Sequence, residues 1–189
     1  MTLYAKWIPN SSPSISYQAQ VQGIGWQAPS YNGETTGTIG QKLRLESLKV
    51  SLSNLTQGLS GSHIQYQAFV QGIGWQNPSA NDGEIAGTIG QSKRMEAMRL
   101  QLTGPISQVY DVYYRVHVQN IGWMAWAKNW QISGTSGMSY RIEALQIQIV
   151  KKGDPIPSSS GSTSFPFLTT PTIKSVSYTH LTLPTNSLV

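Results

Sequence analysis

The sequence contains no cysteine and few charged residues, and both absences narrow the classes of protein it can encode. Without cysteine, the chain can form neither a disulfide nor a metal site with thiolate ligands. Charged residues make up 11% of the 189 residues, less than half the usual share of about 25%. Gln, Ser, Thr, Asn and Gly stand in their place, so we expect a neutral, polar surface that suits uncharged ligands such as glycans.

Long apolar runs and clusters of basic residues are also missing. No segment reaches the roughly 18 apolar residues of a membrane-spanning helix, and Met1–Trp7 has no apolar core of the kind found in signal peptides. The net charge of +5 comes from scattered Lys and Arg, so we do not expect nucleic-acid binding. His63 and His117 have no second ligand at metal-binding spacing, and no Ser, His and Asp arrangement is visible. We therefore expect no metal, no cofactor and no enzymatic activity.

A ten-residue segment occurs three times along the chain, ending at Trp26, Trp75 and Trp123. The copies read YQAQVQGIGW, YQAFVQGIGW and YRVHVQNIGW, and their tryptophans are 49 and then 48 residues apart. A fixed period of this length is typical of repeat architectures. We therefore predict one domain over residues 15–151, made of three repeats at about 15–53, 64–103 and 112–151.

Each repeat has the pattern of β-structure. Tyr17, Ala19 and Val21 alternate with glutamines, which predicts a strand with one buried face. In the last strand the apolar positions change phase between Leu45 and Leu48, as a β-bulge would cause, and the same slip follows the equivalent positions of the other repeats. We expect three or four strands per repeat, an all-β fold without a sizeable helix, and a closed threefold arrangement that is β-prism-like, with a β-trefoil-like fold as the alternative.

Three motifs recur together in the repeats: Val-Gln-x-Ile-Gly-Trp, Gly-Thr-x-Gly, and Arg-x-Glu-x-Leu or Met. This combination resembles the clostridial hydrophobic tryptophan repeat, or ChW repeat, over residues 15–151. The third copy is the most similar, while the first two replace His117 by Gln20 and Phe69. The resemblance implies a secreted or cell-surface protein of Gram-positive bacteria and a role in attachment to a polymer, a cell wall or another protein.

The two ends of the chain differ from the repeats. Residues 1–14 are interpreted as the remnant of an upstream β repeat and a linker, because Thr2–Trp7 resembles the closing strand of the internalin-type B repeat. The chain would then be part of a longer surface protein. Residues 152–189, rich in Ser, Thr and Pro, are predicted to be a disordered tail, and residues 176–185 resemble a translated sequencing adapter.

Residues shared by all three copies are predicted to build the fold. We expect the tryptophans to pack in the core near the pseudo-threefold axis, although a sugar-stacking platform is the alternative. The repeated glutamates each stand two residues after an arginine, which predicts a structural ion pair on one face of a strand. The predicted structural residues are Trp26, Trp75, Trp123, Glu46, Glu96 and Glu143.

Residues in which the copies differ are predicted to carry binding. Trp126 and Trp130 occur in the third copy only, beside Asn129 in a loop that we expect to be exposed. Asn32 and Asp82 occupy the corresponding loops. We therefore predict a non-catalytic, extracellular or cell-surface module that binds a polysaccharide or cell-wall polymer through several weak sites, with a protein–protein interaction or adhesion module as the alternative.

Overall fold

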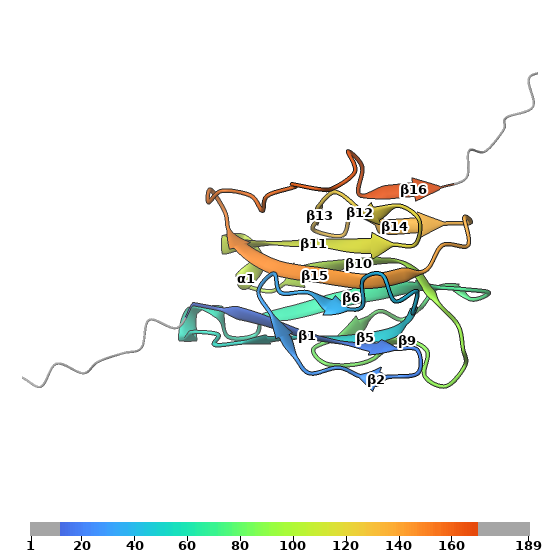
Figure 1. The fold of residues 1–189 in the computed structure, drawn as a ribbon. Coiled ribbons are helices and arrows are strands. Elements are labelled where there is room, and N and C mark those ends of the chain that lie inside the picture. The colour runs from blue at the N-terminus through green and yellow to red at the C-terminus, as the bar shows by residue number, and fades with distance from the viewer. Residues whose placement is uncertain (1–11, 170–189) are drawn as a thin grey trace, which may run out of the picture.

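Three sheets, one centred on each repeat, build the structure, and within residues 12–169 all their strand pairs but one are antiparallel (Figure 1). The computed structural model describes residues 12–169. The interpretations of Thr2–Trp7 and of residues 176–185 lie outside the described residues. None of the helices in the described part of the chain is both long and apolar enough to cross a membrane.

Each repeat supplies five strands, two long and three short, rather than the three or four we predicted from its sequence. Repeat 1 contains β1 (Ser14–Val21), β2 (Gly25–Trp26), β3 (Ser30–Tyr31), β4 (Thr36–Gly37) and β5 (Leu45–Ser53). Repeat 2 contains β6 (His63–Val70), β7 (Gly74–Trp75), β8 (Ala80–Asn81), β9 (Ala86–Gly87) and β10 (Met95–Thr103). Repeat 3 contains β11 (Tyr110–Val118), β12 (Gly122–Trp123), β13 (Ala127–Lys128), β14 (Ser133–Ser136) and β15 (Ile142–Lys151). The connections hold a short 3₁₀ helix, η1 (Gln57–Leu59), and a single helical turn, α1 (Ile106–Val109).

The long strands of each repeat form an antiparallel pair that buries one face in a shared core. In β1 the residues alternate between buried and half-buried, as the period of two predicts. Tyr17, Tyr66 and Tyr114 hold equivalent positions in this core and are 2%, 0% and 0% exposed, so the large aromatic side chains at its centre are tyrosines. The predicted β-bulge is confirmed, since the register shifts between Gln20 and Val21 and at the equivalent places in the other two pairs.

The repeats exchange short strands in a closed cycle. Strand β9 of repeat 2 pairs with β5 of repeat 1, β14 of repeat 3 pairs with β10 of repeat 2, and β4 of repeat 1 pairs with β15 of repeat 3. Each crossing needs a glycine: a Cβ on Gly87 would lie 2.3 Å from the carbonyl oxygen of Glu46, at a φ of 107°. The three sheets remain separate and form no closed barrel, so the fold is β-prism-like and the β-trefoil alternative does not describe it.

The C-terminal segment corrects the prediction of disorder for its described part. Residues 167–169 form β16 (Phe167–Thr169), which pairs in parallel with β14 and lies beside it at the top of Figure 1. The composition of this segment suggested disorder because it has few apolar residues to bury. Backbone hydrogen bonds to repeat 3 hold it instead, and composition does not report such bonds.

Candidate functional site

The repeated tryptophans lie on the outer faces of the sheets, and the prediction that they pack in the core is wrong. Trp26, Trp75 and Trp123 are half-buried and do not belong to the buried core. Each tryptophan faces outward because its partner across the hairpin lies on the solvent-facing side of the long strand. Trp26, for example, pairs with Gln20. A cation covers each ring: Lys49 Nζ lies 4.6 Å from the centre of Trp26. Arginines stand 4.7 and 4.8 Å from the centres of Trp75 and Trp123.

The repeated glutamates are buried and ion-paired, which confirms the structural pair predicted for them. Glu46, Glu96 and Glu143 are 7%, 4% and 5% exposed. Their Oε1 atoms lie 2.7, 2.7 and 2.8 Å from an Nη2 atom of the arginine two residues before. Each glutamate is also the residue left unpaired by the bulge, so the bulge directs its side chain toward the arginine. Each arginine directly precedes the strand that carries its glutamate, and such a local pair suits a structural role better than acid–base catalysis.

The loop residues Asn32, Asp82 and Asn129 hold the turn after β3, β8 and β13. Their side-chain oxygens accept hydrogen bonds from residues near the start of β1, β6 and β11: Ile15 N donates to Asn32 Oδ1 at 3.0 Å, and Ile64 N donates to Asp82 Oδ1 at 2.9 Å. In the third copy the bond to Asn129 Oδ1 is 3.0 Å long. These oxygens therefore serve the fold, and the ligand-binding role of the three residues stays a prediction.

Trp130 occupies a backbone position that glycine holds in the other copies. Gly33 and Gly83 have φ values of 94° and 89° there, and Trp130 has a φ of 69°. A bulky residue in this left-handed region is uncommon and costs conformational energy. Its ring centre lies 4.6 Å from the guanidinium carbon of Arg99, which also lies 4.7 Å from the ring centre of Trp75 and donates two hydrogen bonds to Gln67 Oε1. The result is a stack of two indoles with an arginine between them.

Trp126 forms a second stack of this kind, within repeat 3. Arg115 lies 4.7 Å from its ring and 4.8 Å from that of Trp123. Burial lowers the pKa of Arg115 from its usual value. Trp126 Nε1 also donates a hydrogen bond to the carbonyl oxygen of Ser158 at 2.8 Å, so the C-terminal segment contacts this ring. The ligand-binding role of Trp126 and Trp130 stays a prediction, and one face of each ring is covered by an arginine.

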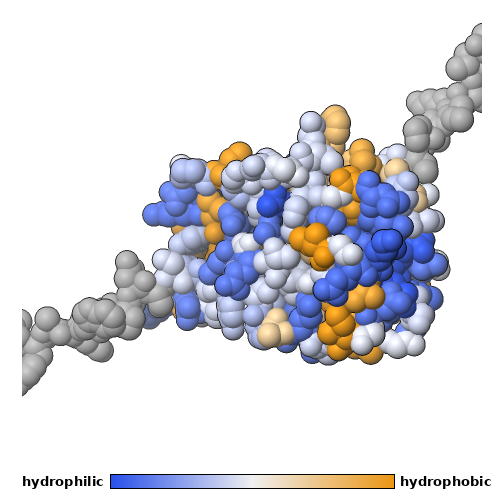
Figure 2. Space-filling view, viewed as in Figure 1, coloured by the Kyte–Doolittle hydropathy of each residue, from blue (hydrophilic) through white to orange (hydrophobic). Residues whose placement is uncertain are grey.

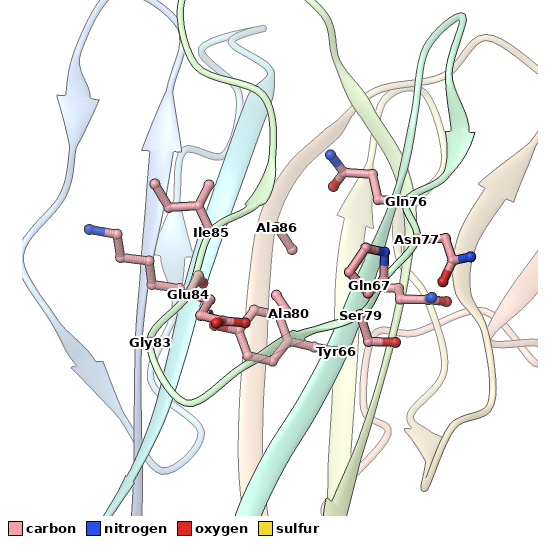
Figure 3. Close-up of a pocket in the computed structure, with 12 residues that line it drawn as sticks. Tyr66, Gln67, Gln76, Asn77, Ser79, Ala80, Gly83, Glu84, Ile85 and Ala86 are labelled. Carbon is pink, nitrogen blue, oxygen red and sulfur yellow. Dashed lines mark hydrogen bonds between the residues drawn. The ribbon is translucent and has the colours of Figure 1, made fainter.

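The clearest hollow lies where repeat 2 meets repeat 1, and the sequence did not single it out. Its volume is about 600 Å³. Figure 3 shows Gln76, Asn77 and Ser79 on one side and Gly83, Glu84 and Ile85 on the other, with Tyr66 of β6 between them. Gln67 of β6 also lines the hollow. Lys49 of β5, which belongs to repeat 1, also lines this hollow. We call this hollow the junction pocket.

A smaller hollow of about 230 Å³ adjoins the junction pocket and shares Lys49 and Gly83 with it. It is lined by Tyr31 of repeat 1 and by Ser51 of β5. At the equivalent place on the next sheet, the ring of Trp130 lies over Arg99, the counterpart of Lys49. Gly83 has no side chain, so the space beside Lys49 stays open. On the next sheet, the indole of Trp130 fills the equivalent space beside Arg99. This contrast between the copies is the signal by which the sequence could have revealed the hollow.

The junction pocket combines uncharged hydrogen-bonding groups with apolar surface. Amides and hydroxyls come from Gln67, Gln76, Asn77 and Ser79, and Ile85 adds an apolar side chain that is 44% exposed. Gln76 uses both ends of its amide internally, since Oε1 accepts a bond from Gly87 N at 2.5 Å and Nε2 donates to Gly87 O at 2.9 Å. The carboxylate of Glu84 accepts a bond from Asn81 N at 2.8 Å. Pocket walls of this kind hold a ligand by shape and by a few directed hydrogen bonds.

Exposed isoleucines form another surface feature. They lie at one end of the sheets, the end where the Gly-Trp turns are. Figure 2 shows apolar patches among hydrophilic residues on one side of the molecule. The exposed isoleucines follow the repeat, since they occupy two equivalent positions in repeats 1 and 2. They are Ile24, Ile39, Ile73 and Ile89, with exposed fractions of 53%, 51%, 47% and 47%.

Comparison with known proteins gives one match. The family model described as clostridial hydrophobic W matches three times, over residues 20–54, 69–104 and 117–151. It covers the repeats and no part of Thr2–Trp7, for which the internalin-type B resemblance is not shown. No curated protein and no solved structure matches the chain. Among residues 12–169 there is no group of three or more His, Asp or Glu placed to hold a metal ion.

Proposed function

The chain belongs to the clostridial hydrophobic W family, and from that premise we propose that it is a non-catalytic, extracellular or cell-surface module that binds a cell-wall polysaccharide in the junction pocket. Repeats of this family are found in surface and secreted bacterial proteins, which suggests a binding module. The observation that carries the proposal is the pocket itself, a hollow of about 600 Å³ whose walls are mostly uncharged and polar.

The walls of the junction pocket match the chemistry of a saccharide. A sugar ring presents hydroxyls that both donate and accept hydrogen bonds, together with apolar C–H faces. Asn77 and Ser79 offer donors and acceptors of the same neutral kind, and Ile85 and Pro78 offer apolar contact. The volume lies within the range of about 300–1,000 Å³ that is typical of small-molecule sites, so one or two sugar rings would fit.

The charges at the rim extend this fit to acidic wall polymers. Lys49 and Glu84 both line the pocket, so it has one group of each sign. Lys49 also lies over Trp26, which fixes the position of its ammonium group at the junction. A polymer that carries hydroxyls and occasional acidic groups would meet complementary partners here.

Two substitutions test the pocket while keeping the fold. Asn77→Ala and Ile85→Thr give repeat 2 the residues that repeat 1 has at the equivalent positions, Ala28 and Thr35, so both should be tolerated. We expect the double variant to lose most of its retention on Gram-positive cell walls stripped of protein. Thr35→Ile, at the matching place in repeat 1, is the control and should bind as the unmodified chain does. Equal retention of all three proteins would remove the support for this site.

A protein-binding role is the second candidate, and the exposed isoleucines favour it. Apolar side chains repeated at one end of a molecule are typical of surfaces that contact other proteins. Ile24→Ser with Ile73→Ser should then lower binding to untreated walls and leave binding to protein-stripped walls unchanged. The pocket variants should show the opposite pattern, so the two functions can be separated in one assay.

A further inference from the structure

The C-terminal segment of residues 158–169 occupies an edge of repeat 3 that the other two repeats close with a side chain. In repeats 1 and 2 a glutamine amide caps the glycine of the exchanged strand. Gly37 N donates to Gln27 Oε1 at 2.5 Å, and Gln27 Nε2 donates to Gly37 O at 3.3 Å. Gln76 bonds to Gly87 in the same way. The amide thus takes the place of a neighbouring peptide group at the edge of β4 and of β9.

Repeat 3 has Met124 where the other copies have this glutamine. The equivalence is structural as well as sequential, since Met124 N donates to Val116 O at 2.9 Å and Gln27 N donates to Ala19 O at 3.0 Å. A methionine cannot bond to the backbone of Gly134, the counterpart of Gly37. Gly134 N instead donates to the carbonyl oxygen of Pro166 at 2.9 Å.

The segment continues along the edge of β14 as a parallel strand. Gly134, Thr135 and Ser136 pair with Phe167, Leu168 and Thr169. Before the strand, Ala125 N donates to Phe165 O at 3.3 Å and Thr163 N donates to Trp123 O at 3.0 Å. Side chains add further bonds: Trp126 Nε1 donates to the carbonyl oxygen of Ser158 and Arg115 Nη1 to Ser162 Oγ, each at 2.8 Å, and Thr163 Oγ1 accepts from Ala125 N at 3.3 Å.

Modest side-chain burial accompanies these bonds: Leu168 packs, partly buried, against the core. No residue from Gly153 to Thr169 is buried, and Phe165 is 62% exposed. Residues 153–156, which connect the segment to β15, are all exposed. A strand held mainly by backbone hydrogen bonds opens more easily than the core and places few demands on sequence.

We propose that the edge of β14, opened by Met124, is an acceptor site for an extended polypeptide strand, and that residues 158–169 are its exchangeable occupant. In this structure the occupant comes from the same chain. The same segment of a second copy carries the same groups and fits the same edge. The connection through residues 153–156 lets the segment leave without disturbing β15.

The first test changes the acceptor in the full chain. Met124→Gln gives repeat 3 the capping amide of the other repeats, so it should close the edge and release the segment. Amide hydrogen exchange should rise by about tenfold or more at residues 163–169, while β6, β10, β11 and β15 keep their protection. Gln76→Gly is the matched control, because it removes a cap from repeat 2 and should leave the segment in place. Unchanged protection of residues 163–169 in a folded Met124→Gln protein would overturn the proposal.

The second test cuts the connection. A protease site introduced between Gly153 and Pro157 of the full chain allows the segment to be separated after folding. We expect the cut segment to dissociate on dilution, and a fluorescently labelled peptide of residues 158–169 to bind the remaining body with saturation. Addition of Met124→Gln should abolish that binding. If the body unfolds once the segment leaves, or if the labelled peptide does not bind, the segment is a fixed part of the domain and the proposal fails.

Discussion

Replacement of Gly87 by alanine should weaken the link between repeats 1 and 2 far more than an alanine at a nearby glycine. The added Cβ would stand 2.3 Å from Glu46 O and 2.5 Å from Ser47 Cα, distances at which the two strands must separate. Overpacking of this kind costs about 1–3 kcal/mol, and a left-handed backbone adds about 1–2 kcal/mol for a residue with a side chain. We therefore expect Gly87→Ala to lower the free energy of unfolding by about 2–5 kcal/mol.

Gly90 provides the control, because it also has a positive φ, 68°, yet a Cβ there would meet nothing within 4 Å. Gly90→Ala should cost only the backbone strain, about 1–2 kcal/mol. Urea denaturation followed by circular dichroism measures both values. Equal losses for the two variants would show that the close strand crossing does not hold the repeats together, and the cyclic exchange of strands would lose its energetic role.

Two further perturbations test the backbone of Trp130 and the buried tyrosines. Trp130→Gly and Trp130→Ala both remove the stack on Arg99, but only alanine keeps a side chain at positive φ. The alanine variant should therefore be less stable than the glycine variant by about 1 kcal/mol, as measured by thermal denaturation. The reverse order of stability would refute backbone strain at Trp130. Burial raises the pKa of Tyr17 and of Tyr66 from 10.0 to about 12. An unfolded chain loses these protons near pH 10, so stability should be intact below pH 10 and should fall as the pH rises toward 12, by about 1.4 kcal/mol per pH unit for each tyrosine. The urea midpoint measured from about pH 9 to 12 checks this, and a flat profile would contradict it.

Local patterns in the sequence predicted the features that depend on neighbours along the chain. Alternation of Tyr17, Ala19 and Val21 gave the buried face of β1, and the phase slip at Leu45 gave the bulge. The arginine and glutamate two residues apart gave the buried ion pair, although the bulge at the glutamate, and not regular alternation along the strand, brings the two side chains together. Each of these inferences requires only the geometry of a single strand.

Features that depend on distant parts of the chain could not be predicted in this way. The tryptophans face outward because of their pairing across a tight hairpin, and hydrophobicity alone favoured the core. The junction pocket combines Lys49 of repeat 1 with Ile85 of repeat 2, which come together only through the exchange of β9. The C-terminal segment binds through its backbone, and the decisive residue, Met124, lies more than thirty residues before it.

Mapping of bound saccharide onto the protein tests the central claim most directly. Soluble oligosaccharides released from protein-free Gram-positive cell walls would be titrated into the isotopically labelled chain, and amide shifts would be followed by nuclear magnetic resonance. The proposed site predicts saturable shifts at Asn77, Ser79 and Ile85 and at Lys49 across the junction, and their loss in Asn77→Ala with Ile85→Thr. Saturable shifts confined to other surfaces, or none at millimolar oligosaccharide, would contradict a glycan site in the junction pocket.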